Sequence, residues 1–245
     1  MAQQEDEWFS TWFDSPYYHI LYNNRDTQEA QAFMDRLLVY LHPKPHEKIL
    51  DLACGKGRYS KYLNEKGFDV TGIDLSGKSI AHAKQYENEH LHFDVHDMRK
   101  VYKPEHFDFI LNLFTSFGYF DNETENVVAL DATAKSLKHG GKLVIDFMNT
   151  DKVINNLVAE EEKEVHAINF RITRGVENGF IVKTIRFYDE GKEYVFVERV
   201  RALREVDFEE YFKMIQLRLV EVFGDYHLNP FDLDKSERAI FVLKK

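Results

Sequence analysis

The sequence predicts an α/β protein: a seven-stranded, mostly parallel sheet with helices on both faces, and an antiparallel β meander inserted after the fifth strand. Two observations predict the sheet. Short apolar segments alternate with amphipathic ones over residues 30–148, and several of the apolar segments lack polar alternation, as strands buried on both faces do. A third observation predicts the meander, because long β-rich segments follow, separated by the turn sequences "GVENG" and "DEGK".

The first half of the chain supplies five strands and four helices in alternation. A helix over residues 30–41 has apolar residues at three-and-four spacing, and "HPKP" ends it because proline cannot continue a helix. Ser76 is a good N-cap for a later helix, and Gly140 and Gly141 follow the end of the last one. The predicted strands are residues 48–53, 69–74, 91–95, 107–113 and 142–148, and the other predicted helices are 57–66, 76–87 and 122–137.

The second half adds the meander and closes the sheet. Asp207, with Glu210 three residues later, resembles a capping box that opens a helix running to about residue 217. The predicted meander strands are residues 164–174, 180–189 and 192–203, and the closing strands are 219–226 and 238–243. We therefore divide the chain into an N-terminal aromatic lid and helix (1–45), a core (46–150 and 205–245) and a β insertion (151–204).

Composition excludes several classes of function. The formal net charge of −10 disfavours nucleic acid as a partner. Cys54 is the only cysteine, so no intramolecular disulfide or thiol-based metal cluster can form, and we predict no metal site. The acidic N-terminus lacks the features of a signal peptide, and no apolar stretch reaches the roughly 20 residues needed to span a bilayer. We expect a cytoplasmic protein without a membrane span.

The stretch "ILDLACGKGRYS" places Gly55 and Gly57 where the first strand passes to its helix, the point at which open parallel sheets bind ligands. Glycines there let the backbone approach a ligand closely. A dinucleotide fingerprint requires Gly or Ala at the position held by Ser60, so a dehydrogenase is disfavoured. Asp51 and Asp74 end the first two strands, and a carboxylate after the second strand is suited to a ribose.

The ordered runs "ILDLACGKG", "VTGIDLS", "DVHDMR", "FDFILNLFTSFGYF" and "GGKLVIDFMN" resemble the motifs of class I S-adenosylmethionine-dependent methyltransferases. The resemblance spans residues 49–149, and the closing "GDYHLNPFDLDKSERAIFVLKK" is similar to that family's final strand pair. Ala53 stands where the family usually has Gly. The resemblance implies a Rossmann-like fold, S-adenosyl-L-methionine as methyl donor, S-adenosyl-L-homocysteine as product, and a small-molecule acceptor.

The resemblance also implies roles for individual residues. Asp51 would lie near the methionine ammonium, Asp74 would bind the ribose, and Asp97 would accept a hydrogen bond from the adenine amine. The other implied cofactor contacts line the methionine part (Ala53, Gly55, Gly57), flank the adenine (Leu75, Met98) or lie under the methionine and methyl group (Asn112, Leu113, Phe114). A sulfonium cation suits carboxylates and aromatic faces, which agrees with these assignments.

The aromatic N-terminal segment is the predicted lid. By similarity to such methyltransferases, we expect Tyr22 near the sulfonium, and Arg25 near the methionine carboxylate. Trp8, Phe9 and Trp12 fit a role as core filler. Methyl transfer depends mainly on positioning, and a base is needed only if the acceptor loses a proton. The polar candidates on the acceptor side, for catalysis, are Tyr18, His19, Ser116 and Tyr119.

Three alternatives stay open. An NAD-dependent oxidoreductase fits the glycine turn but is disfavoured by Ser60 and Asp51. A binding protein could keep the cofactor pocket without catalysis. An RNA or protein methyltransferase is a further alternative, although an RNA enzyme would be expected to carry a basic appendage or an "NPPY"-type sequence where this chain has "NLFT". The chain is compatible with a monomer or a homodimer.

Overall fold

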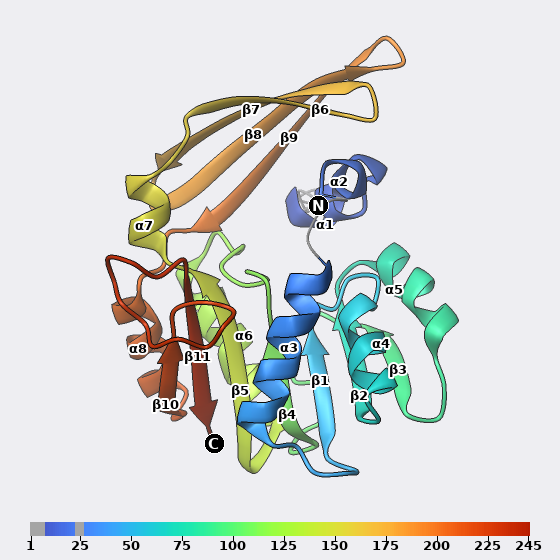
Figure 1. The fold of residues 1–245 in the computed structure, drawn as a ribbon, viewed down its shortest axis with the longest axis vertical. Coiled ribbons are helices and arrows are strands. Elements are labelled where there is room, and N and C mark those ends of the chain that lie inside the picture. The colour runs from blue at the N-terminus through green and yellow to red at the C-terminus, as the bar shows by residue number, and fades with distance from the viewer. Residues whose placement is uncertain (1–7, 23–26) are drawn as a thin grey trace, which may run out of the picture.

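Two separate β-sheets organise the computed structural model, which describes residues 8–22 and 27–245 (Figure 1). The larger sheet has seven strands in the order β10-β11-β5-β4-β1-β2-β3. Strands β1 to β5 run parallel, and β11 is antiparallel to both of its neighbours, β5 and β10. Its strands are β1 (Lys48–Leu52), β2 (Asp69–Asp74), β3 (Leu91–Val95), β4 (Phe107–Asn112), β5 (Leu137–Met148), β10 (Arg218–Phe223) and β11 (Arg238–Lys244). The predicted mostly parallel, seven-stranded sheet is confirmed.

Helices cover both faces of this sheet because its strands bury alternate residues on opposite sides. In β1, Ile49 faces one apolar cluster and Leu50 the other. The face of Ile49 packs against α3 (Thr27–Leu41), α4 (Arg58–Glu65) and α5 (Gly77–Ala83), which continues as a 3₁₀ turn (Lys84–Tyr86). The face of Leu50 packs against α6 (Glu123–Ser136) and α8 (Glu205–Met214).

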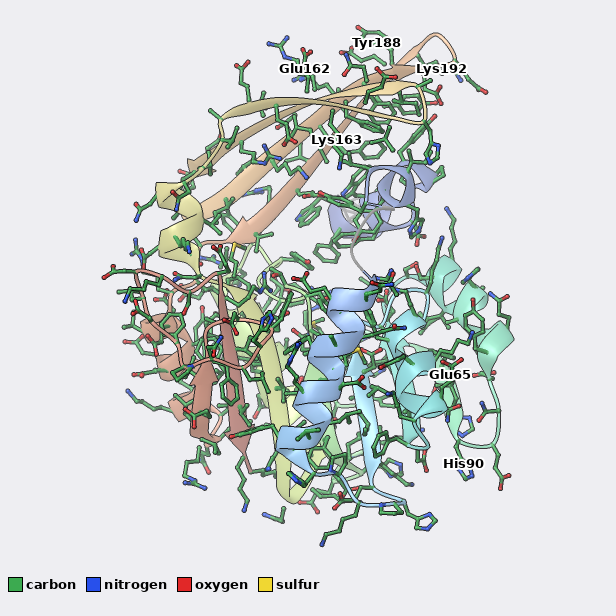
Figure 2. All side chains as sticks on the ribbon, in the orientation of Figure 1. Glu65, His90, Glu162, Lys163, Tyr188 and Lys192 are labelled. Atoms are coloured by element: carbon green, nitrogen blue, oxygen red, sulfur yellow. The ribbon has the colours of Figure 1, made fainter. Side chains whose placement is uncertain are left out.

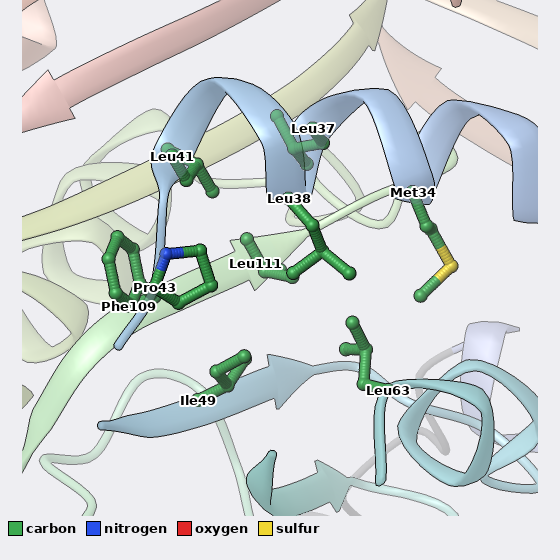
Figure 3. A pocket seen from close by; sticks show the side chains of 9 residues that line it. All are labelled: Met34, Leu37, Leu38, Leu41, Pro43, Ile49, Leu63, Phe109 and Leu111. Atoms are coloured by element: carbon green, nitrogen blue, oxygen red, sulfur yellow. The ribbon is translucent and has the colours of Figure 1, made fainter. Parts of the chain in front are cut away.

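The contact between α3 and the sheet is closely packed. The side chains in Figure 3, among them Met34, Leu37 and Leu111, surround an apolar cavity of about 10 Å³ between α3, β1 and β4. Such a volume holds at most one water molecule, and its lining offers no polar partner. This cavity is therefore a packing defect of the core.

The second sheet is an antiparallel meander of β6 (Glu160–Val165), β7 (Ile168–Glu177), β8 (Phe180–Asp189) and β9 (Lys192–Arg201). It follows α7 (Thr150–Asn155) and arches over one end of the larger sheet (Figure 1). Tyr188 and Lys192 lie at its far tip, in the β8–β9 hairpin (Figure 2).

The short helices α1 (Trp8–Phe13) and α2 (Pro16–Leu21) lie between the meander and the larger sheet (Figure 1). Trp12 is 1% exposed, and its ring lies 4.4 Å from that of Phe196 in β9. Trp12 and Leu21 share an apolar cluster with the inner residues of β7 and β8, such as Phe170 and Ile185. The N-terminal segment therefore completes the core of the meander.

Most predicted elements agree with the structure to within a few residues, and three differ. The segment predicted as one strand over residues 164–174 contains the turn between β6 and β7, so the meander has four strands. Helix α8 begins at Glu205, and Asp207 lies inside it, accepting a 2.7 Å hydrogen bond from the Arg204 backbone N–H. The residues after Ser136 enter β5 directly, so Gly140 and Gly141 belong to a strand and do not end α6. Helix α7 was not predicted.

Within the described residues, no helix is long and apolar enough to cross a membrane.

Candidate functional site

The turn between β1 and α4 is built around a buried carboxylate. Asp51 in β1 is 6% exposed, and its Oδ2 accepts a 2.6 Å hydrogen bond from the Ser60 hydroxyl. Burial disfavours the charged form and raises the pKa of Asp51 to about 6, and the nearby charge of Asp74 adds to the rise. The sequence marked Ser60 only as a mismatch to the dinucleotide fingerprint, so its part in holding Asp51 was not predicted.

A second carboxylate, Asp74, lies at the end of β2 and ties the turn to this strand. Its Oδ2 accepts from the Gly55 N–H and its Oδ1 from the Ser76 N–H, each at 2.8 Å. Burial raises the pKa of Asp74 above its ordinary value, although these backbone hydrogen bonds oppose the rise. Among residues 8–22 and 27–245, the hydrogen-bond partners of Asp51 and Asp74 are the Ser60 hydroxyl and the backbone N–H groups of Gly55 and Ser76, with no Lys or Arg side chain among them. The two carboxylates therefore suit a ligand that carries positive charge.

The glycines of the turn differ in what surrounds them. A Cβ on Gly55, at φ +55°, would meet no atom within 4 Å. A Cβ on Gly57, at φ +75°, would lie 2.6 Å from the Phe93 ring and 2.9 Å from the Ala83 Cβ. Gly55 therefore borders open space beside Asp74, whereas Gly57 allows α4 to pack against β3. Ala53 also adopts a left-handed φ, +64°, which shows that the turn accepts a Cβ where there is room.

After β3, the carboxylate of Asp97, the residue predicted to bind the adenine amine, already has a charged partner. Asp97 is held by Arg99, whose Nε lies 3.0 Å from both carboxylate oxygens and whose Nη2 lies 2.8 Å from Oδ2. Burial by itself raises the pKa of Asp97, but the hydrogen bonds from Arg99 hold it below its ordinary value. Met98 is partly buried against the core, and Leu75, after β2, is 39% exposed. The partner Arg99 was not predicted for Asp97.

The loop that follows β4 is held by its own hydrogen bonds. Asn112 is 2% exposed, and its Nδ2 donates to the carbonyls of Leu52 (3.1 Å) and Ser116 (3.3 Å). The Ser116 hydroxyl donates to the Leu113 carbonyl at 2.8 Å. The Phe114 ring lies 4.5 Å from that of Tyr59 in α4. Asn112, Leu113, Phe114 and Ser116 therefore form one structural unit next to the end of β1.

The lid contacts the turn between β1 and α4 and its neighbours. Asp14 lies between α1 and α2, accepts a hydrogen bond from the Ser76 hydroxyl, and forms an ion pair of 3.9 Å with Lys78. Burial lowers the pKa of His19, and the positive charge of Lys56 in the turn lowers it further. At neutral pH the imidazole of His19 is therefore uncharged.

The predicted tyrosines lie on two sides of the lid. The Tyr119 ring is 5.6 Å from Phe13, which in turn is 5.0 Å from Tyr18, so these three rings form one aromatic group. The Tyr119 hydroxyl donates to the Thr115 carbonyl. Tyr22 points toward the meander, where its hydroxyl donates to Glu198 Oε1 at 2.6 Å. Arg25 lies outside the described residues.

Glu198 of β9 is the centre of the lid–meander contact. Its Oε1 also accepts a 2.7 Å hydrogen bond from the Trp12 indole, and its Oε2 lies 3.6 Å from Lys183 Nζ in the paired strand β8. No local sequence pattern marks Glu198, because its partners lie about 15 residues away in β8 and more than 170 residues away in the lid.

The chain is similar to known methyltransferases. Residues 49–141 match the family model described as "Methyltransferase domain". The chain is 27% identical over 209 residues to "Putative methyltransferase YqeM" of Bacillus subtilis (strain 168), covering 81% of this chain and 84% of that protein. It is 28% identical to a dTDP-3-amino-3,4,6-trideoxy-alpha-D-glucopyranose N,N-dimethyltransferase of Streptomyces venezuelae, covering 53% of this chain and about half (54%) of the relative's length.

The fold is also found in solved structures. A crystal structure of an S-adenosylmethionine-dependent methyltransferase from Clostridium acetobutylicum ATCC 824 matches with a TM-score of 0.78. The match has 20% sequence identity and covers 93% of this chain and 95% of the other. At that identity the likeness concerns the fold, and it includes both the core and the meander.

Proposed function

We propose that this chain, a member of the class I S-adenosylmethionine-dependent methyltransferases, transfers the methyl group of S-adenosylmethionine to a small-molecule acceptor. One observation carries the proposal. Asp51, which is buried, and Asp74, which is partly buried, have no Lys or Arg hydrogen-bond partner among the described side chains, and Asp74 lies beside the open space at Gly55. This combination suits a ligand that bears an ammonium and a ribose together.

The proposed cofactor contacts follow from this geometry. Asp51 would face the ammonium of the methionine part, with Ser60 fixing the orientation of its carboxylate. The Asp74 oxygens each accept one backbone N–H, which leaves acceptor capacity for the two ribose hydroxyls. Ala53, Gly55 and Gly57 would line the methionine part.

Adenine would lie between the ends of β2 and β3. Leu75 and Met98 offer apolar surface there, and Asp97 offers a carboxylate whose orientation is set by Arg99. Three N–H groups of Arg99, its backbone N–H, Nε and Nη2, occupy three of the four acceptor positions of the Asp97 carboxylate, which leaves one for an exocyclic amine.

On the acceptor side, the chain's own residues position the reactants. When bound, S-adenosylmethionine supplies an electrophilic methyl group on a sulfonium cation. Asn112, Leu113 and Phe114 would lie beneath it, with the aromatic faces of Tyr18 and Tyr119 nearby. Tyr22, whose hydroxyl donates to Glu198 of the meander, would lie on the acceptor side. Positioning of two reactants lowers the activation barrier by up to roughly 7–11 kcal/mol in favourable cases.

An amine is the acceptor class that we test first. The named sugar relative is an N,N-dimethyltransferase. An amine must be neutral to attack, and the uncharged imidazole of His19 could take its proton at neutral pH. Ser116 and Tyr119 remain the other polar candidates. The insertion, residues 151–204, and the lid, within residues 1–45, would shape this acceptor pocket on the core formed by 46–150 and 205–245. The lone, buried Cys54 fits a cytoplasmic enzyme.

Calorimetric titration with S-adenosylhomocysteine and S-adenosylmethionine tests the proposal. We expect saturable binding to the unaltered chain, and a loss of roughly tenfold or more in Asp74→Ala, since each hydrogen bond to a charged group contributes about 1.5–3 kcal/mol. Glu65→Gln, which removes an exposed charge on α4, is the control and should bind normally. Absence of binding by the unaltered chain contradicts the proposal, and saturable binding of NADH supports the oxidoreductase alternative. With binding established, release of S-adenosylhomocysteine across a panel of small amines measures transfer.

A further inference from the structure

The loop after β4 has a strained backbone at two successive residues. Phe114 has a φ of +61° and Thr115 a φ of +58°. Neither residue is a glycine, and the left-handed region is especially unfavourable for a β-branched residue such as threonine. Contacts from the surrounding structure must therefore hold this conformation, and the loop is the one that we expect beneath the transferred methyl group.

One residue of β5 receives both backbone N–H groups of this strained pair. The Phe114 N–H donates to Oδ2 of Asp146 at 2.7 Å, and the Thr115 N–H donates to the Asp146 carbonyl at 3.0 Å. Asp146 is 0% exposed, so its carboxylate faces no solvent. Its side chain and its backbone together fix the path of the loop.

Arg238, the first residue of β11, completes the arrangement. Its Nε and Nη2 lie 2.8 and 2.7 Å from Oδ1 of Asp146, and Nη2 also donates to the Thr115 hydroxyl at 2.7 Å. The Tyr226 hydroxyl donates to Asp146 Oδ2 at 3.2 Å, and its ring stacks 4.5 Å from that of Phe33. The guanidinium fork thus binds the carboxylate and the strained loop at the same time.

A buried ion pair is weak evidence for a purely stabilising role, because the desolvation of both charges offsets most of their attraction. This pair differs from a simple pair in that both members also bind the loop. The chain uses an Arg, whose planar fork can make these bonds together, and a Lys could not reproduce them.

We propose that Asp146 and Arg238 are positioning residues for methyl transfer, which hold Phe114 and Thr115 in the left-handed conformation that presents the loop to the cofactor. This inference rests on the proposed function. The two residues act through the loop, whose Phe114 ring they keep against Tyr59 and whose Ser116 carbonyl meets Asn112.

The test compares Arg238→Lys and Arg238→Met with the unaltered chain in calorimetric titration with S-adenosylhomocysteine. Denaturant unfolding identifies conditions in which each variant is fully folded. We expect an affinity loss of about a hundredfold for Arg238→Met and about tenfold for Arg238→Lys, because lysine restores the charge without the fork. Arg174→Lys is the matched control, since Arg174 pairs with Glu161 on the meander at a distance from the loop, and its affinity should be unchanged.

A purely structural role would shift the unfolding midpoint and leave the affinity of the folded protein unaltered. An affinity of Arg238→Lys within twofold of the unaltered chain therefore overturns the inference. Failure of Arg238→Lys to fold, while Arg174→Lys folds, assigns the pair to folding and also overturns it. Absence of S-adenosylhomocysteine binding by the unaltered chain overturns the proposed function, and the inference with it.

Discussion

Alanine at Gly57 and alanine at Gly55, the two glycines of the turn between β1 and α4, should have different effects. The first should mainly lower stability and the second should mainly lower cofactor affinity. In Gly57→Ala, the new Cβ would lie 2.6 Å from two atoms of the Phe93 ring and 2.9 Å from the Ala83 Cβ. The ring cannot retreat easily, since a Cβ built on Gly72 would also meet it at 2.7 Å, which shows how closely the backbone surrounds it. Phe93 is 1% exposed. The substitution therefore forces either the ring or α4 to move.

The magnitude follows from two contributions. A left-handed φ costs an alanine about 1–2 kcal/mol, and an extra methyl group in a filled core costs typically 1–3 kcal/mol. The smaller entropy of the unfolded alanine chain returns about 0.4–1 kcal/mol. We expect Gly57→Ala to lower the free energy of unfolding by about 2–4 kcal/mol, and Gly55→Ala, whose Cβ meets nothing within 4 Å, by about 1 kcal/mol or less.

The loss of cofactor affinity should be larger in Gly55→Ala than in Gly57→Ala, the reverse of the order for stability. The Gly55 methyl group would enter the space proposed for the methionine part, so Gly55→Ala should weaken S-adenosylhomocysteine binding by tenfold or more. Denaturant unfolding and calorimetry of both variants measure the two effects, and Gly57→Ala with Phe93→Leu should recover part of the lost stability. Equal losses of stability in the two glycine variants would refute the packing argument. Unchanged affinity in Gly55→Ala would refute the assignment of that space to the cofactor.

Two further predictions concern pH and the lid. Because the pKa of Asp51 is raised to about 6, its contribution to the free energy of unfolding is most favourable below pH 4. That contribution, about 3 kcal/mol, is lost as pH rises through 6. Denaturant unfolding between pH 4 and 8 should show this loss in the unaltered chain and a smaller one in Asp51→Asn. Binding of S-adenosylmethionine should strengthen over the same range, as the carboxylate ionises; affinity that is flat from pH 5 to 7 would contradict the ammonium role. Trp12→Phe removes the 2.7 Å hydrogen bond to Glu198 and should lower the free energy of unfolding by about 1.5–3 kcal/mol more than Trp8→Phe. Trp8 Nε1 has no hydrogen-bond partner among the described residues, so equal losses in the two variants would argue against the Glu198 contact.

The parallel sheet and its turn were predictable because their signals are local. Ser76 was predicted as an N-cap, and its hydroxyl accepts a 2.9 Å hydrogen bond from the Ser79 N–H. The apolar runs of β1, β2 and β4 and the glycines of the first turn lie within short segments, so pattern and spacing suffice. The positions of Asp51 and Asp74 at the ends of neighbouring strands follow from the predicted strand pattern.

The errors arose where a local signal was missing or had another cause. His166 and Ala167 form the β6–β7 turn with φ values of +51° and +62°. These conformations normally favour Gly or Asn, so neither residue type indicates a turn. Gly141 resembled part of a helix stop, but a Cβ there would lie 2.9 Å from the Lys138 carbonyl and 3.0 Å from the Asp108 carbonyl. That glycine allows close approach of backbone within the sheet.

The two halves of the proposed site are encoded differently. The cofactor half lies along one stretch of chain, whereas the acceptor half joins the lid to a meander more than 150 residues away through Trp12, Tyr22 and Glu198. The lid also fills the apolar core of the meander. If a change of acceptor requires changes in the lid, matching changes in β8 or β9 are therefore needed. Without them, Glu198 would lose its hydrogen-bond donors or the apolar face of the meander would lose its cover. Acceptor preference in this architecture should vary through paired substitutions in the lid and the meander, while the turn at Asp51 stays as it is.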